Sequence, residues 1–150
     1  MKLNLPEYNF TLRKQNGKTE ILDIFRNTYV SLTPEEWVRQ HFLRFLVEEK
    51  GFPASLIAVE KGLTVNGKPR RFDAVAYNNR GMPLVLMEFK SANIALSQKV
   101  FEQISLYNQL LQVKYLIVSN GLKHYCCEID FEKQSIRFLK DIPQFGEINT

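Results

Sequence analysis

The sequence contains little that would anchor the chain in a membrane, cross-link it or bind zinc. No apolar run reaches the roughly 18 to 20 residues of a membrane span, and the opening MKLNLPEYNF lacks the apolar core of a signal peptide. We therefore expect a soluble, cytoplasmic protein with no membrane partner. The two cysteines, Cys126 and Cys127, are adjacent in a strand-like segment. Their side chains should point to opposite faces, so no disulfide is expected between them. With two histidines and no CxxC pair, no structural zinc site is expected.

Internal repeats, biased tracts and linkers are also absent, which favours a single domain. A chain of 150 residues is the usual size of one domain, and 45% hydrophobic content is typical of a folded chain. We expect a core over residues 33–120, with a hairpin extension at residues 1–32 and a second hairpin at 121–150.

Turn and capping signals place the first elements. Asn16 and Gly17 separate two segments that alternate apolar and polar residues, which predicts a hairpin. Thr33 can cap a helix and Gly51 can end one, and the apolar residues between them recur at helical spacing. The pattern predicts a helix that begins after Thr33 and runs to about residue 50.

The rest of the chain alternates strands and a helix. Three strand-like segments, at residues 55–60, 70–77 and 84–90, are joined by turn-rich residues, which predicts an antiparallel meander. Helical periodicity over about 96–112 precedes a buried strand at 115–119. A strand, a helix and a second strand in succession usually form a right-handed crossover, in which the two strands are parallel. The strand at 115–119 should therefore lie parallel to the third strand of the meander. HYCCEID and SIRFL fit a final hairpin. The expected fold is α/β, a mixed central β-sheet flanked by helices in the order αβββαβ, with added hairpins.

The stretch LVLMEFKSAN ends an apolar strand in two charges. Glu88 and Lys90 share one face of this strand, and Phe89 faces the other. Pairing through the turn at residues 78–81 would place Asp73 opposite Glu88. Adjacent carboxylates repel each other and burial adds a desolvation cost, so the pair favours a cation. Mg²⁺ is the natural candidate, because it binds one or two carboxylates, keeps waters and accepts phosphate oxygens.

Lys90 beside such a site could hold or deprotonate a water and stabilise charge at phosphorus, which suits metal-assisted phosphodiester hydrolysis. A simpler interpretation also fits: Glu88 and Lys90 could form a surface ion pair, and Asp73 could pair with Arg71. The order of the features favours the metal site, because a carboxylate on one strand is followed by ExK at the end of the next and then by a helix.

Gln103 and Tyr107 are four residues apart in the expected second helix, so they share a face. A glutamine on the core side of a helix needs polar partners, and it could orient catalytic groups or hold a phosphate. A glutamine at the flank of the helix and a half-buried tyrosine would fit the same spacing.

The formal charge of +4 and the pI near 9.1 permit a polyanionic partner. Basic residues gather just before Asp73, and a solvated hairpin tip would explain them equally simply. The candidate DNA contacts are Lys61, Lys68, Arg70, Arg71 and Lys99.

RRFDAVAY, LMEFK and QISLY, in this order, resemble the PD-(D/E)XK nuclease superfamily, in particular its members with a QxxxY motif. TPEEWVRQHFLRFL, RRFDAVAY, LMEFK and VSNG are similar to the N-terminal nuclease domain of type I restriction enzyme R subunits and its stand-alone relatives, over about residues 20–125. One departure is that Arg71 and Phe72, rather than proline, precede Asp73.

The resemblance implies a single restriction-endonuclease-like domain with a Mg²⁺ or Mn²⁺ site. The implied metal ligands are Asp73, Glu88 and the backbone carbonyl of Phe89, and the implied catalytic set is Asp73, Glu88, Lys90, Gln103 and Tyr107. Glu36 matches the acidic residue that many members carry on the first helix, and it fits a helix capping box about equally well.

The leading expectation is a Mg²⁺-dependent endonuclease that hydrolyses DNA. The alternative is a non-catalytic module of the same fold that binds DNA or a partner subunit, and RNA cleavage or resolution of branched DNA is a third possibility. No GxxxxGK[ST] phosphate loop occurs, so the chain has no motor of its own. The expected partners are DNA, a motor or specificity subunit, and a second copy of the chain.

Overall fold

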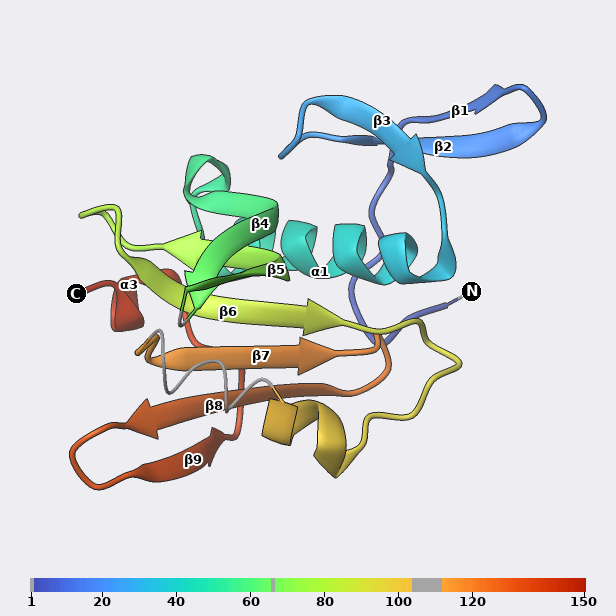
Figure 1. The fold of residues 1–150 in the computed structure, drawn as a ribbon. Coiled ribbons are helices and arrows are strands. Elements are labelled where there is room, and N and C mark those ends of the chain that lie inside the picture. Colours follow the sequence, from blue (N-terminus) through green and yellow to red (C-terminus); the bar gives the residue numbers. More distant parts are fainter. Residues whose placement is uncertain (1, 66, 104–111) are drawn as a thin grey trace.

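The computed structural model describes residues 2–65, 67–103 and 112–150 (Figure 1). The strands are β1 (Leu12–Gln15), β2 (Lys18–Asp23), β3 (Thr28–Ser31), β4 (Ile57–Val65), β5 (Lys68–Tyr77), β6 (Pro83–Phe89), β7 (Tyr115–Ser119), β8 (His124–Asp130) and β9 (Ser135–Leu139). The helices are α1 (Pro34–Lys50), the short 3₁₀ turn η1 (Ala54–Leu56) and α3 (Phe145–Ile148), and residues 98–103 are also helical. Within these described ranges, no helix is long and apolar enough to cross a membrane.

Six strands form the central sheet in the order β4-β5-β6-β7-β8-β9. β6 and β7 are parallel, and the other neighbours are antiparallel. This arrangement confirms the predicted mixed sheet, the meander, the crossover after β6 and the final hairpin. The helix that begins at residue 98 lies in the connection between the two parallel strands, which need a long crossover between them.

Helix α1 begins and ends where the sequence predicts. The Thr33 hydroxyl accepts a hydrogen bond from the backbone N–H of Glu36 at 3.0 Å, and Gly51 ends the helix in the left-handed conformation with φ of 72°. The apolar face of α1 is fully buried against the central sheet, and it consists of Val38, Phe42, Leu43 and Leu46.

The two faces of the central sheet pack into separate apolar clusters. In β6, Met87 and Phe89 contact the cluster beneath α1, whereas Leu86 contacts the cluster on the opposite face. The adjacent cysteines Cys126 and Cys127 divide between the same two clusters and are both free, as predicted. The face opposite α1 is covered in part by residues that follow β6, namely Leu96, Val100 and Phe101.

A separate small sheet precedes α1 and lies beside its N-terminal end (Figure 1). Its β1–β2 hairpin turns at Asn16 and Gly17, both with positive φ (54° and 76°), which is typical of a type I′ turn and confirms the predicted hairpin. The third strand, β3, was not predicted. Its four residues are too short to establish an alternating pattern, and it is held by pairing with β2.

Gly121, in the turn after β7, provides a test of how closely the N-terminal segment packs on the core. Its φ is +85°, and an added Cβ would lie 2.8 Å from Leu3 Cδ2 and 3.1 Å from Val38 Cγ2. We expect Gly121→Ala to lower the free energy of unfolding by about 2 kcal/mol, because it adds crowding to backbone strain. Urea denaturation measures the change. Gly17→Ala is the matched control, since Gly17 has φ of +76° with no atom within 4 Å. Equal losses in the two variants would contradict the crowding at Gly121.

Candidate active site

The pairing of β5 with β6 brings two carboxylates together at one end of the sheet. The register pairs Ala74 with Met87 and Val75 with Leu86. One further step places Asp73 opposite Glu88, in the register predicted from the sequence. The backbone N–H of Phe89 donates to Asp73 Oδ2 at 2.6 Å, so the Asp73 carboxylate closes the ladder where backbone pairing ends.

The pairing of β4 with β5 is interrupted beside Asp73. The described ladder between β4 and β5 passes from Val59–Ala74 to Lys61–Phe72 and skips Glu60, whose φ is 52°. Phe72 and Val75 contact the same cluster although they are three residues apart, so the alternation of faces breaks between them. The regular structure of these two strands is therefore interrupted at the position that carries Asp73.

Glu88 is held in surroundings that oppose its negative charge. Burial, followed by a hydrogen bond and Coulomb repulsion with Asp73, raises the pKa of Glu88 to about 9, against the lowering effect of Lys90. At neutral pH the metal-free pair therefore retains a proton. A cation between the two carboxylates would remove the repulsion and replace this proton.

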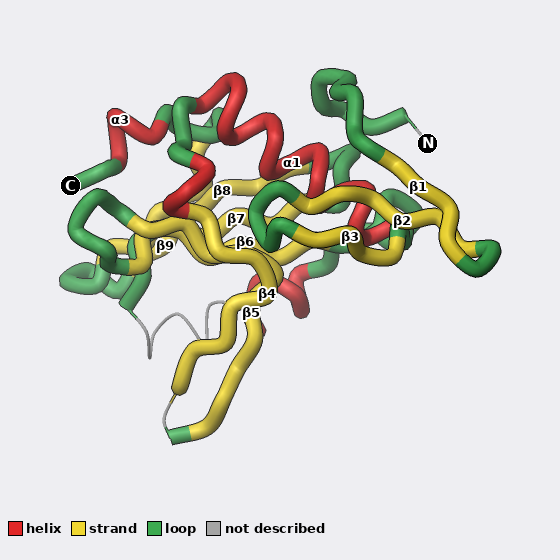
Figure 2. Tube along the Cα trace, turned by 90° about the horizontal axis from the view of Figure 1, so that it is seen from above, coloured by secondary structure: helices red, strands yellow, loops and turns green. Residues whose placement is uncertain are grey.

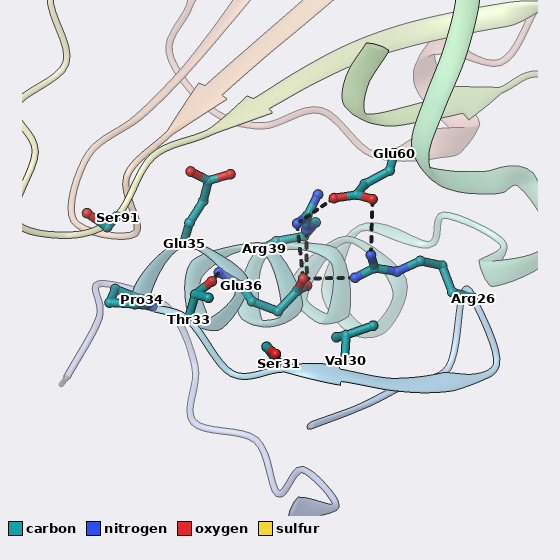
Figure 3. A pocket seen from close by; sticks show the side chains of 10 residues that line it. All are labelled: Arg26, Val30, Ser31, Thr33, Pro34, Glu35, Glu36, Arg39, Glu60 and Ser91. Carbon is teal, nitrogen blue, oxygen red and sulfur yellow. Dashed lines mark hydrogen bonds and ion pairs between the residues drawn. The ribbon is translucent and has the colours of Figure 1, made fainter. Parts of the chain in front are cut away.

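An acidic residue of α1, Glu35, interacts electrostatically with this pair. Burial and the charge of Asp73 raise the pKa of Glu35, while Arg39 and Lys90 lower it, so Glu35 faces the candidate site. Its side chain extends in a different direction from that of Glu36, and both line a hollow of about 570 Å³ (Figure 3).

Glu36, the residue that the sequence favoured, is only 4% exposed and is part of an ion-pair network. Its carboxylate accepts hydrogen bonds from Arg26, Arg39 and Gln40. The predicted capping box forms only in its first half, because Thr33 N donates to Ser31 O instead of to Glu36. The role of Glu36 as a metal ligand stays a prediction. Sequence reasoning missed Glu35, although adjacent helical residues differ in direction by about 100° and either could have faced the site.

Backbone contacts fix the segment that carries Lys90. The N–H of Lys90 donates to Ser119 O at 2.9 Å, so the backbone of Phe89 faces β5 instead of β7. The carbonyl of Phe89 lies on this same side as its N–H, toward Asp73. Asn120 Nδ2 donates to Ile94 O at 2.8 Å and anchors the loop after Lys90. These two contacts give a structural reason for the VSNG motif at the end of β7.

The structure describes only one residue of the second predicted pair, Gln103 and Tyr107. Gln103 is exposed at the end of the described helical residues 98–103. Tyr107 lies outside the described residues. The supporting role of Gln103 and Tyr107 therefore stays a prediction.

The predicted DNA contacts lie mainly on the β4–β5 hairpin, which extends away from the rest of the fold (Figure 2). Lys61, Lys68 and Arg71 are exposed and Arg70 is half-buried, while Lys99 is exposed in the helical residues 98–103. Arg71 Nη1 lies 3.8 Å from Glu60 Oε2, beside the irregularity in the ladder. The β4–β5 hairpin thus forms a basic arm that begins beside the candidate site.

The oxygen donors at the site suit Mg²⁺ or Mn²⁺ better than a metal that needs a closed protein cage. In the described part of the chain, no three His, Cys, Asp or Glu side chains converge closely enough to hold a metal ion. Mg²⁺ does not require three, because it binds through one or two carboxylates, retains waters and takes phosphate oxygens from its substrate. Asp73, Glu88 and the carbonyl of Phe89 are a donor set of this kind.

Comparisons with known proteins identify the fold and the family of this chain. A fragment assigned to an HsdR subunit of a type I restriction enzyme from Vibrio vulnificus YJ016 has a similar fold, with a TM-score of 0.57 and 22% sequence identity. The match covers 78% of this chain and 24% of that chain, so this chain spans about a quarter of its structural relative. A search of curated protein sequences finds no significant match. The family described as type I restriction enzyme R protein N terminus matches residues 34–143, and the chain belongs to this family.

Proposed function

We propose that this chain is a Mg²⁺- or Mn²⁺-dependent endonuclease domain that hydrolyses phosphodiester bonds in DNA. The observation that carries the proposal is that two carboxylates, Asp73 and Glu88, face each other at the end of neighbouring strands, where burial and the charge of Asp73 raise the pKa of Glu88 against the opposing effect of Lys90. A structural ion pair would not need two carboxylates pressed together. Membership of a restriction-enzyme family and the basic β4–β5 hairpin favour DNA as the substrate.

Each residue of the site has a distinct role in this proposal. Asp73 and Glu88, with the carbonyl of Phe89, would hold the metal ion, which supplies Lewis-acid stabilisation of the phosphate. Glu35, whose pKa is raised by burial and by the charge of Asp73, would accept a hydrogen bond from a metal-bound water. Lys90 carries a compact positive charge on a flexible stem, and it would hold the attacking water and stabilise the charge that develops on the phosphate oxygens. Gln103 and Tyr107 would support these groups.

The proposed partners follow from the family. Type I restriction enzyme R subunits suggest DNA and other type I subunits, including a motor or specificity component, as partners of this chain. A second copy of the chain would supply the second cut in duplex DNA. Contacts from the hairpin would be made to phosphates, so affinity for DNA should fall steeply with salt.

Substitution of Lys90 tests the proposed hydrolysis. We expect wild-type protein to cut plasmid DNA in the presence of Mn²⁺ or Mg²⁺, and Lys90→Gln to slow cleavage by at least about 10²-fold, because a positioned proton donor or acceptor typically contributes that much. Single-turnover cleavage of supercoiled plasmid measures the rate. Lys133→Gln is the control, since Lys133 is exposed in the turn between β8 and β9.

Two outcomes would reject the nuclease and favour the non-catalytic module. One is that the protein cuts no DNA form with either ion. The other is that Lys90→Gln cuts as fast as the wild type. DNA binding that ignores both metal and the Asp73→Asn substitution would then identify a binding module.

A further inference from the structure

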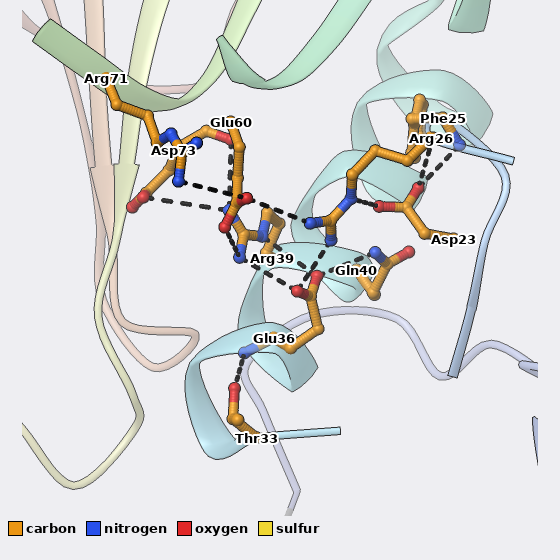
Figure 4. A network of polar contacts seen from close by, with 10 residues as sticks. All are labelled: Asp23, Phe25, Arg26, Thr33, Glu36, Arg39, Gln40, Glu60, Arg71 and Asp73. Atoms are coloured by element: carbon orange, nitrogen blue, oxygen red, sulfur yellow. Dashed lines mark hydrogen bonds and ion pairs between the residues drawn. The ribbon is translucent and has the colours of Figure 1, made fainter. Parts of the chain in front are cut away.

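Arg39 lies at the centre of a polar network that runs beneath the candidate site (Figure 4). Its side chain is only 5% exposed. Nε donates to Glu36 Oε2 and Nη2 donates to Glu36 Oε1, both at 3.0 Å, which makes a two-pronged contact. The remaining nitrogen, Nη1, donates to the backbone carbonyl of Asp73 at 3.3 Å and lies 3.9 Å from Asp73 Oδ1.

The Asp73 carboxylate is therefore oriented from two sides. The N–H of Phe89 holds Oδ2, and Arg39 lies against Oδ1 and the backbone carbonyl. These contacts come from β6 and from α1, which pack on each other through the core. With both oxygens placed, the carboxylate keeps one orientation relative to Glu88 on the neighbouring strand, as a metal ligand requires.

The position of Arg39 is fixed in turn by the small N-terminal sheet. Glu36 also accepts from Arg26 Nη2 at 2.8 Å and from Gln40 Nε2 at 2.9 Å. Arg26 follows the end of β2 and is paired with Asp23, which is fully buried. A continuous set of charge-assisted contacts thus connects β2, through α1, to Asp73 on β5.

Arg39 has more contacts than the neutralisation of Glu36 requires. Arg26 and Gln40 already contact the Glu36 carboxylate, and Glu60 Oε1 lies 3.6 Å from Arg39 Nη2 as an additional acidic neighbour. Within the described part of the chain, the third nitrogen of Arg39 contacts the backbone carbonyl and the carboxylate of Asp73. We propose that Arg39 is a positioning residue that holds Asp73 for metal binding, and that the N-terminal sheet supports it through Arg26 and Glu36. This inference rests on the proposed function.

The sign of the change in metal affinity separates positioning from a simple effect of charge. Loss of a nearby positive charge alone would strengthen the binding of a divalent cation. Loss of an oriented ligand would weaken it, and substitutions of outer partners of metal ligands typically cost 10–100-fold in affinity. Arg39→Met keeps an unbranched apolar stem in place of the aliphatic part of arginine, and it removes the guanidinium group with its charge. We expect this variant to bind Mn²⁺ at least about tenfold more weakly, whereas the loss of charge alone would make binding tighter.

Calorimetric titration of Mn²⁺ at one fixed pH measures these affinities. Arg39→Lys should give an intermediate affinity, because lysine retains a charge but has no fork with which to contact Glu36 and Asp73 at once. The matched control is Arg44→Met. Arg44 is on the same helix and pairs with Glu48 at 3.0 Å, away from Asp73, and we expect its variant to bind Mn²⁺ as the wild type does.

The outcomes are distinguishable. If the wild type binds Mn²⁺ and Arg39→Met binds it equally well or more tightly, the positioning role is overturned and the proposed nuclease function is not affected. No Mn²⁺ binding by the wild type would overturn both. Circular dichroism and thermal melting show whether each variant folds. If Arg39→Met does not fold, Arg39→Lys decides the question, since affinity equal to that of the wild type would reject the inference and weaker binding would support it.

Discussion

Glu88→Gln should make the metal-free protein more stable at pH 8, by on the order of 3 kcal/mol in the free energy of unfolding. The reason is that the folded protein holds the Glu88 carboxyl against its natural ionisation. Glutamine has the shape of the protonated acid and can donate a hydrogen bond to Asp73 without carrying a charge. A substitution that abolishes metal binding would therefore strengthen the fold.

The pH dependence gives the sign of this effect. The pKa of Glu88 is raised from 4.5 to about 9 in the folded protein, so from about pH 5 to 9 the folded state holds a proton that the unfolded state has lost. The stability that this proton contributes is complete below about pH 4.5 and declines as pH rises toward 9, by about 1.4 kcal/mol per pH unit. In Glu88→Gln this decline should disappear.

Urea denaturation in the presence of EDTA, at intervals from pH 5 to 9, measures both curves. Groups distant from Glu88 are the same in the two proteins, so the difference between the curves reports Glu88 together with its coupling to its charged neighbours, Asp73, Lys90 and Glu35. Glu48→Gln is the control, because Glu48 is an exposed glutamate paired with Arg44 and its variant should follow the wild type. If the free energies of unfolding of wild type and Glu88→Gln changed in parallel with pH, Glu88 would not have a raised pKa beside Asp73. Added Mn²⁺ should reverse the order, since only a protein that binds the ion gains stability from it.

Phe42→Ala should lower the free energy of unfolding by about 3 to 5 kcal/mol, because it leaves a large cavity between α1 and the central sheet. Phe42 is fully buried, with its ring centroid 5.3 Å from that of Phe89 and 5.4 Å from that of His124. Phe89 is the residue between Glu88 and Lys90, so the same contact that stabilises the core also holds the strand end that carries the site.

Chemical denaturation, with the midpoint and the slope both fitted, measures this loss. The matched control is Phe138→Ala on β9. Phe138 is 60% exposed, although its ring contacts Phe101 and Tyr125, and we expect its removal to cost about 1 kcal/mol or less. A loss at Phe42 no larger than that at Phe138 would show that α1 does not anchor the strand end.

The sequence was informative wherever a local pattern determines structure. Thr33 and Gly51 bound α1 because capping depends on a few neighbouring residues. The register that places Asp73 opposite Glu88 agrees with the simplest pairing through the turn, although the ladder shifts by one residue between Ala76 and Tyr77, and no pattern in the sequence indicated that shift. The alternation of side chains along a strand correctly predicted that Phe89 faces the core on the opposite side from Glu88 and Lys90.

Features that depend on long-range contacts were not predictable in this way. The choice between Glu35 and Glu36 depends on how α1 is rotated against the sheet, and the helical pattern does not fix that rotation closely enough. The positive φ of Glu60 has no signal in its residue type, because the left-handed conformation is usually found at glycine or asparagine. The contact of Arg39 with Asp73 joins residues 34 positions apart, so no local motif reveals it.

The alternation of side chains in β6 also limits how this family can vary in length. Loss or gain of one residue within the strand would turn Glu88 and Lys90 into the apolar core and expose Phe89, which is now 1% exposed. The β4–β5 hairpin carries no such constraint, because its outer part extends away from the core (Figure 2). The length of the strand that carries the ExK motif is therefore constrained by packing on the core, whereas the length of the basic arm is not.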